Sequence, residues 1–393
     1  MKFDWMTATI DDVCTVVTDG AHNSPKSVEQ GYYMASVKDF TEFGFDFSNC
    51  KQIGKEDYEK LRNQGCVPEK NDILVGKDGA RYFEDIIIYK QDERPALLSS
   101  IAILRADCRK ITPEFLYYTL KSPAVRKDVR ENYGSGSAIP RIVLKDFKRM
   151  PFSFPSIEEQ RKITNLCSTI DAKIQINNAI NENLLQQTQA LYKNRFVDLK
   201  PFDGEMPPDW RLGTVSEIIE LHDSKRIPLS SRERANLAKI YPYYGATSVM
   251  DYVDRYLFDG IYLLLGEDGT VVDSKGFPIL QYVEGKFWVN NHAHIITGKN
   301  GFTVETLYLL FSLTNVQSIV TGAVQPKISQ GNLNKVSVVI PSEAALSAFN
   351  SIVQPIFAHI RNLRAENDRL AATRDTLLPR LMSGELDVSS LDI

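Results

Sequence analysis

The sequence contains IEEQRKITNLCSTIDAKIQINNAINENLLQQTQALYKNRF at residues 157–196 and EAALSAFNSIVQPIFAHIRNLRAENDRLAATRDTLLPRLM at residues 343–382. Both stretches repeat apolar residues every seven positions over about five heptads, which predicts two long helices. The residues that we assign to the helix-pairing seam are Ile163, Ile170, Ile174, Asn181, Leu184 and Leu191 in the first stretch and Phe349, Val353, Ile356, Ile360, Leu363, Asn367, Leu370 and Leu377 in the second.

The width of the apolar stripe favours packing of these helices on each other. A helix on a globular core shows a wider stripe with a period of 3.6 residues, which is the alternative reading. Asn181 and Asn367 hold equivalent seam positions, and a polar seam residue is a way to set the register of a coiled coil. We therefore predict an antiparallel coiled coil. Pro355 should kink the second helix or mark the end of a short lead-in helix.

The residues outside the helices also form a repeat. GKDGA at 76–80 returns as GEDGT at 266–270. GSAIPRI at 136–142 returns as GAVQPKI at 322–328, and this shift of 186 positions also relates the two seams. Each half contains short apolar runs separated by turn residues, namely DIIIY at 85–89, SIAILRA at 100–106, GIYLLLG at 260–266 and AHIIT at 293–297.

This repeat predicts an α+β fold of two similar mixed α/β modules, each followed by a long helix, in a pseudo-twofold arrangement. We place module 1 at residues 1–155, the central helical spacer at 156–200, module 2 at 201–341 and the C-terminal helical spacer at 342–393. Helices of about 40 residues would span roughly 60 Å and would suit a molecular ruler.

Composition excludes several classes of protein. The 393 residues carry 46 Lys and Arg against 50 Asp and Glu, a net charge of −4, so bulk basicity gives no argument for nucleic acid. The sequence has five cysteines, an odd number, and no CxxC pair, so neither disulfides nor a structural zinc site is expected. The sequence shows neither a secretion signal nor a long apolar run, and we expect a cytoplasmic protein with no membrane partner.

Five segments, in this order, make the family resemblance specific. They are PSIEEQRKI at 155–163, YPYYGATSVMDYVDRYLFDG at 241–260, LLGEDG at 264–269, WVNNHAHII at 288–296 and LLPRLMSGEL at 377–386. The chain resembles, over essentially its whole length, the specificity subunit of a type I restriction-modification enzyme. The resemblance implies two target-recognition domains that each read one half of a split double-stranded DNA sequence, with helical regions that bind modification subunits.

The resemblance also implies that the chain is not catalytic. The expected partners are two methyltransferase subunits, together with ATP-dependent restriction subunits that join through the complex. S-adenosylmethionine, ATP and Mg²⁺ would bind to these partner chains. The residues agree with this expectation, because the sequence has no Gly-rich loop ending in GK[ST] and no [ND]PP[YF] tetrapeptide. We expect no cofactor on this chain.

The two repeated motifs are the first candidate DNA contacts. In the glycine-rich segments the backbone could approach a phosphate, and Arg141 or Lys327 would supply the cation. A glycine-rich hinge that ends in proline explains the same residues equally well. The Asp-Gly turn repeats while the charge beside it changes from Lys77 to Glu267, so we interpret the turn as structural and only its flanking cations as variable contacts.

Local basic clusters supply further candidates, since cations that face phosphates dominate sequence-independent affinity. The clusters are KSPAVRKDVR at 121–130 and HDSKRIPLSSRER at 222–234, and a solvated helical face is the alternative for the first. The complete set of predicted DNA-binding residues is Asn23, Lys26, Lys77, Arg81, Arg126, Lys127, Arg130, Ser135, Ser137, Arg141, Lys225, Arg226, Asn291, Gln325 and Lys327.

His292 and His294 lie two residues apart on a predicted strand and therefore point to one face. Ser100 and Ala102 replace them in the first half. No HExxH or CxxC pattern accompanies the pair, so we expect hydrogen-bonded histidines without a metal ion.

Two other classes of function remain open to the sequence. The rival interpretation is an assembly scaffold that does not bind DNA, in which the coiled coil docks helical partners and the modules bind protein or glycan. The acidic composition favours this alternative. An enzyme is the third interpretation, and it would depend on His292 and His294 because no nucleophile-base motif is present.

Overall fold

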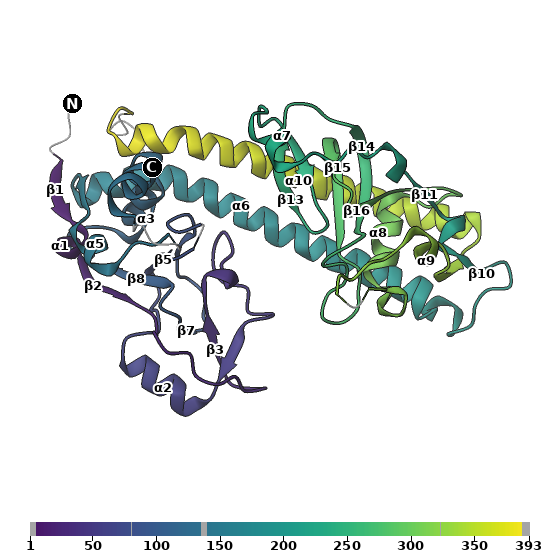
Figure 1. The fold of residues 1–393 in the computed structure, drawn as a ribbon, viewed down its shortest axis with the longest axis horizontal. Helices are drawn as coiled ribbons and strands as arrows, with labels where there is room; N and C mark the ends of the chain where they lie inside the picture. The colour runs from purple at the N-terminus through teal and green to yellow at the C-terminus, as the bar shows by residue number, and fades with distance from the viewer. Residues whose placement is uncertain (1–4, 80, 135–139, 323, 387–393) are drawn as a thin grey trace. The chain divides into compact units, whose positions relative to one another are not determined.

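The computed structural model describes residues 5–79, 81–134, 140–322 and 324–386 (Figure 1). The chain divides into two compact units. Unit 1 comprises Met1–Asn177 with Glu366–Ile393, and unit 2 comprises Asn178–Ala365. Helices α6 (Ile157–Tyr192) and α10 (Glu343–Met382) each have residues in both units. Within the described ranges, no helix combines the length and apolar composition needed to cross a membrane.

Unit 1 contains small sheets covered by helices. Its strands are β1 (Met6–Thr9), β2 (Cys14–Asp19), β3 (Tyr32–Ala35), β4 (Lys51–Ile53), β5 (Ile73–Gly76), β6 (Ile86–Ile88), β7 (Ala96–Leu97), β8 (Ile101–Ala106) and β9 (Pro151–Phe154). Its shorter helices are α1 (Ile10–Val13), α2 (Lys55–Asn63), α3 (Pro113–Lys121), α4 (Pro123–Asp128) and α5 (Leu144–Arg149). The strand orders are β2-β8-β5-β6, β4-β3-β7 and β1-β9.

Unit 2 repeats this topology, and the strands that match β5 and β6 are longer. Its strands are β10 (Arg211–Thr214), β11 (Ile219–Leu221), β12 (Tyr241–Tyr244), β13 (Val249–Val253), β14 (Phe258–Gly266), β15 (Leu280–Val289), β16 (Ala293–Gly298) and β17 (Ser337–Ile340), and its shorter helices are α7 (Ser231–Ala235), α8 (Val304–Ser312) and α9 (Gln330–Asn334). The order β11-β16-β14-β15 matches β2-β8-β5-β6, and the β10-β17 pair matches β1-β9. Helix α8 packs on β14, β15 and β16 (Figure 1).

Local sequence explains where the principal helices begin. Thr112 and Thr303 are equivalent N-caps, and their hydroxyls accept hydrogen bonds from the backbone N–H groups of Phe115 and Thr306 at the starts of α3 and α8. The α6 helix begins at a capping box in which the Glu159 carboxylate accepts from the Ser156 N–H at 3.1 Å. These repeated caps place corresponding helices on corresponding sheets.

Helices α6 and α10 pack on each other, as the heptads predict. In unit 1, Asp171 contacts Arg374 and Asn177 contacts Asn367, so residue numbers fall in α10 as they rise in α6 and the pairing is antiparallel. In unit 2, the Phe349 ring packs on Tyr192 with centroids 5.7 Å apart. Both helices also join the module cores: Ile163 of α6 and Leu381 of α10 lie in the unit 1 core, and Tyr192 of α6 and Ile360 of α10 lie in the unit 2 core. The two sequence interpretations therefore describe parts of one arrangement.

The observed burial follows the assigned seam with one departure. Leu191 is 44 % exposed, whereas its neighbour Tyr192 is buried. A straight α-helix drifts relative to a seven-residue repeat, and the π-helical turn Lys193–Val197 then brings Phe196 into the unit 2 core. The other seam residues are buried (Ile163, Ile170, Ile174, Phe349, Val353, Ile360, Leu363) or half-buried (Asn181, Leu184, Ile356, Asn367, Leu370, Leu377).

Pro355 does not end a separate lead-in helix, because α10 is one helix from Glu343 to Met382. Proline removes the hydrogen bond to the carbonyl four residues earlier. That carbonyl belongs to Ser351, and both residues lie on the exposed face of α10, where water can replace the lost donor.

Candidate nucleic-acid interface

The two repeated motifs come together in each unit. In unit 1, the Gly79 N–H donates to the Pro140 carbonyl at 3.0 Å, and the Ile142 N–H donates to the Lys77 carbonyl at 3.0 Å. In unit 2, the corresponding bonds join Gly269 to Pro326 at 3.0 Å and Ile328 to Glu267 at 2.8 Å. The Asp-Gly turn therefore supports the proline-containing segment that carries Arg141 or Lys327.

Backbone contacts hold the described residues of the exposed tip in unit 2, which are 321, 322 and 324–327. Thr321 and Lys327 exchange backbone hydrogen bonds of 2.9 and 2.7 Å. Gly322 has φ of +89°, and a Cβ atom there would lie 2.2 Å from the Gln325 carbonyl oxygen. Val324 is 99 % exposed and Gln325 is exposed beside it. The tip thus presents side chains to solvent from a constrained turn.

Lys77 departs from the predicted role of a surface cation. Its side chain is buried, and its ammonium lies 3.2 Å from the Asp19 carboxylate and 3.9 Å from Asp78. His22 contacts the other oxygen of Asp19 at 3.4 Å. Lys77 therefore neutralises Asp19 behind the turn, because a buried carboxylate needs a partner.

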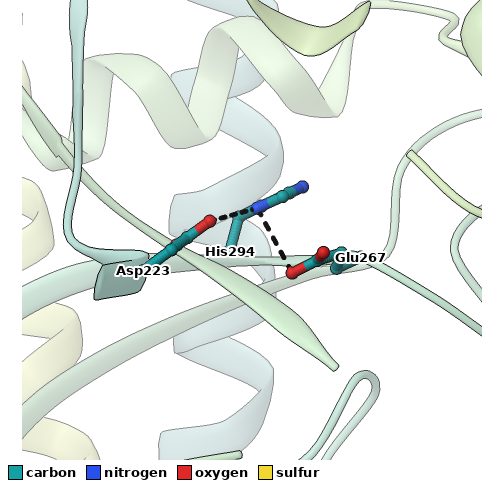
Figure 2. A group of neighbouring side chains, drawn as sticks. All are labelled: Asp223, Glu267 and His294. Carbon is teal, nitrogen blue, oxygen red and sulfur yellow. Dashed lines mark hydrogen bonds and ion pairs between the residues drawn. The ribbon is translucent and has the colours of Figure 1, made fainter. Parts of the chain in front are cut away.

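Unit 2 replaces this pair with a larger ion-pair network, of which Figure 2 draws Asp223, Glu267 and His294. His294 is fully buried, and its Nδ1 lies 2.6 Å from Asp223 Oδ2 and 3.6 Å from Glu267 Oε2. Arg226 donates to Glu267 at 2.6 Å and contacts Asp223 at 3.6 Å. Lys327 lies 3.2 Å from Glu267 Oε1. Like Lys77, Arg226 is engaged within the protein.

The network keeps both carboxylates charged. Burial alone would raise the pKa of Asp223, but hydrogen bonds from His294, the Ile295 amide and Gln330 hold it below its ordinary value. Burial likewise opposes ionisation of Glu267, and Arg226, His294 and Lys327 together lower its pKa. The result is two ionised acids behind the surface of unit 2.

The same three side chains, Asp223, Glu267 and His294, place possible metal ligands within 4.8 Å of one another. However, His294 Nε2 lies 2.8 Å from the Ile328 carbonyl oxygen, so both ring nitrogens have protein partners. Arg226 occupies Glu267 Oε2. A structural metal site leaves its ligand atoms for the ion, so this geometry fits a network of ion pairs better.

Strand register shows that the networks of the two units are equivalent. Val75 lies opposite Ala102, and Leu265 lies opposite His294. Asp19 at the end of β2 pairs with Ala102, and Asp223 lies in the turn just after β11, where it contacts His294. Each acid has a cationic or titratable residue three positions later, His22 or Arg226. The change from Lys77 to Glu267 is thus accompanied by a change from Ala102 to His294, which places an imidazole ring 3.6 Å from the new carboxylate.

Other predicted cations lie at the surface, mostly beside acids of the same unit. Arg81 contacts Asp85 at 2.8 Å, Lys127 lies 3.9 Å from Glu131, and Arg130 bonds Glu84. Arg126 is half-buried and donates to the Glu84 carbonyl at 3.1 Å, and burial lowers its pKa, so its position favours a structural role. The remaining exposed candidates are Asn23, Lys26, Arg141, Lys225 and Asn291, while Ser135 and Ser137 lie outside the described residues.

Comparison with known proteins places this geometry in a family. The family model described as the type I restriction modification DNA specificity domain matches residues 2–186 and 207–370. The MjaIX type I restriction enzyme specificity subunit of Methanocaldococcus jannaschii is 26 % identical over 309 residues, which cover 72 % of this chain and 71 % of that protein. The MjaVIII specificity subunit of the same organism is 22 % identical over 372 residues, with 85 % and 84 % covered.

A solved structure supports the fold. The crystal structure of the S subunit of a type I restriction-modification system from M. genitalium aligns with a TM-score of 0.51 at 19 % identity. The alignment covers 97 % of this chain and 96 % of that one. Two mixed α/β modules followed by paired helices are therefore shared with a solved specificity subunit.

Proposed function

Because the chain belongs to the family of type I restriction-modification DNA specificity subunits, we propose that it reads an asymmetric, bipartite DNA target with one half-site for each module. As a specificity subunit it is the non-catalytic member of its complex. We assign the recognition modules to residues 1–155 and 201–341 and the helical spacers to 156–200 and 342–393. S-adenosylmethionine, ATP and Mg²⁺ bind to the partner chains.

The observation that carries this proposal is the matched turn and proline segment in the two units. Both units build the segment with equivalent backbone hydrogen bonds, yet one carries Arg141 and the other Lys327 with Glu267 behind it. A shared scaffold with different side chains suits two readers of different sequences. Exposed amides such as Asn291 and Gln325 suit base edges in the major groove, and the cations suit phosphates.

The paired helices supply the remaining part of the proposal. We assign to them the docking of two methyltransferase subunits, because the pseudo-repeat offers two similar helical surfaces. Restriction subunits would join through that complex. Since α6 is one helix with residues in both units, its length would set the number of unread base pairs between the half-sites.

Enrichment of random duplexes by the full chain with its methyltransferase partner tests this proposal. The expected product is one split motif with a constant gap, bound with an affinity that falls steeply with salt. The rival assembly scaffold predicts a complex that forms normally but enriches no motif. That result would reject the DNA-reading function.

A further inference from the structure

The two units differ in what faces the cation of the proline segment. In unit 2, Lys327 is 47 % exposed and lies 3.2 Å from a carboxylate oxygen of Glu267. In unit 1, Arg141 occupies the equivalent position and is exposed. Within the parts of the chain that the structure describes, no carboxylate lies within ion-pair distance of Arg141, and position 77 behind it carries a lysine instead of an acid.

Glu267 is held from the protein side, whereas Lys327 reaches it from the solvent side. The Glu267 side chain is only 13 % exposed, and Arg226 holds its Oε2 atom at 2.6 Å. Its other oxygen, Oε1, is the one that faces Lys327. Carboxylate and phosphate oxygens are similar acceptors for an ammonium group, so an anchored carboxylate competes with DNA for the same lysine.

The network tolerates the departure of Lys327. His294 Nδ1 lies 2.6 Å from Asp223 and 3.6 Å from Glu267, so the ring stays between the two carboxylates whether or not Lys327 is present. Arg226 contacts both acids, at 3.6 Å from Asp223 and 2.6 Å from Glu267, and keeps these contacts without help from Lys327. Lys327 can therefore exchange Glu267 for a phosphate without leaving an uncompensated buried charge.

We propose that Glu267 is a specificity-determining residue of unit 2, whose carboxylate holds Lys327 away from DNA phosphate and so weakens sequence-independent binding by this unit. The inference rests on the proposed function, in which Lys327 meets phosphate once a half-site is bound. Unit 1 lacks this competitor, so Arg141 contributes to sequence-independent binding and Lys327 does not.

A double-mutant cycle on the full chain tests the inference. Binding to a duplex of unrelated sequence is measured across a salt series for the native chain, Glu267→Gln, Lys327→Ala and the double variant. Glu267→Gln should raise affinity by about two- to fivefold, the range for releasing an exposed ion pair. It should also steepen the logarithmic salt slope by up to about 0.9, the value for one added phosphate contact. In the Lys327→Ala background, Glu267→Gln should change neither quantity.

A second variant is needed because the glutamine introduced by Glu267→Gln could disturb folding around its buried side chain. Arg226→His, Glu267→Lys and His294→Ala together reproduce in unit 2 the residues that unit 1 uses, and this triple variant should show the same gain in affinity. Arg141→Ala is the matched control, because it should lose affinity and slope whatever residue stands at position 267.

Equal effects of Glu267→Gln with and without Lys327→Ala would show that Glu267 does not act through Lys327 and would overturn the inference. An unchanged affinity for both Glu267→Gln and the triple variant would overturn it as well, while leaving the DNA-reading function intact. Loss of all salt-dependent binding, including that of the native chain, would instead refute the proposed function on which the inference rests.

Discussion

Replacing Asp171 with alanine would leave Arg374 buried without its nearest partner. In unit 1, Arg374 Nη1 lies 2.6 Å from Asp171 Oδ1, and both side chains are less than a tenth exposed. The Tyr118 hydroxyl donates to the other oxygen of Asp171, also at 2.6 Å. One carboxylate thus joins α6, α10 and α3.

The expected cost follows from burial and from the partners that remain. Burial disfavours the charged form of Arg374, but hydrogen bonds to Asp171 and Asp375 outweigh this and raise its pKa, so the guanidinium stays charged. Removing one partner of a buried pair costs about 3–5 kcal/mol. Because Arg374 keeps Asp375 at 2.9 Å and Glu42 at 3.5 Å, we expect the lower end, about 3 kcal/mol for Asp171→Ala.

Hydrogen exchange of peptides from the unit 1 parts of α6 and α10 measures this loss locally, where it should appear as exchange faster by about a hundredfold. Asp375→Ala is the control, since Asp375 is 64 % exposed and its loss should cost under about 1 kcal/mol. The pair Asp171→Leu with Arg374→Met should recover most of the stability, because apolar residues can replace a buried ion pair. Equal acceleration by Asp171→Ala and Asp375→Ala, or no recovery in the paired variant, would refute the reasoning.

Three further predictions concern the tip, the charge network and the helices. Gly322→Ala should lower affinity for the second half-site by about tenfold, because an alanine at this positive φ strains the backbone by roughly 1–2 kcal/mol. The affinity is measured on duplexes that carry one half-site. Gly331→Ala is the control and should have no effect, because a Cβ atom there meets nothing within 4 Å. The folded-state pKa values of Asp223 and Glu267 lie below their ordinary 3.8 and 4.5. Their contribution to stability is therefore present above about pH 4.5 and is lost as pH falls through the lower folded values. Midpoints of urea unfolding measured against pH should show this loss, and the loss should be smaller in Asp223→Asn. Deleting seven residues from each of α6 and α10 should change the gap in the enriched motif but not its half-site sequences, and a changed half-site would contradict the role given to the helices.

The paired helices were predictable because their signal is local. Residues such as Ile163, Ile170 and Phe349 repeat within a continuous stretch, and the structure buries them. The departure at Leu191 was not predictable, because it depends on where α6 turns toward the unit 2 core and on Phe196 filling that core. A heptad pattern describes a helix pair but not the place where the pair meets a third element.

The candidate interface was predictable only in its parts. The sequence shows both the Asp-Gly turns and the proline segments, but not that they pair, because they lie about 60 residues apart. Lys77 looked like a DNA contact because its partner Asp19 is equally distant in the chain. A usable signal existed in the second half: the change of Lys77 to Glu267 and the change of Ala102 to His294 are complementary. Reading the two changes together would have predicted a buried pair of charges.

The most direct test of the central claim is a single-base methylation map of DNA from cells that express this chain with its methyltransferase subunit. The account predicts one methylated motif in two unlike parts, separated by a gap of constant length. A complex that forms and methylates DNA with no such split motif would contradict it.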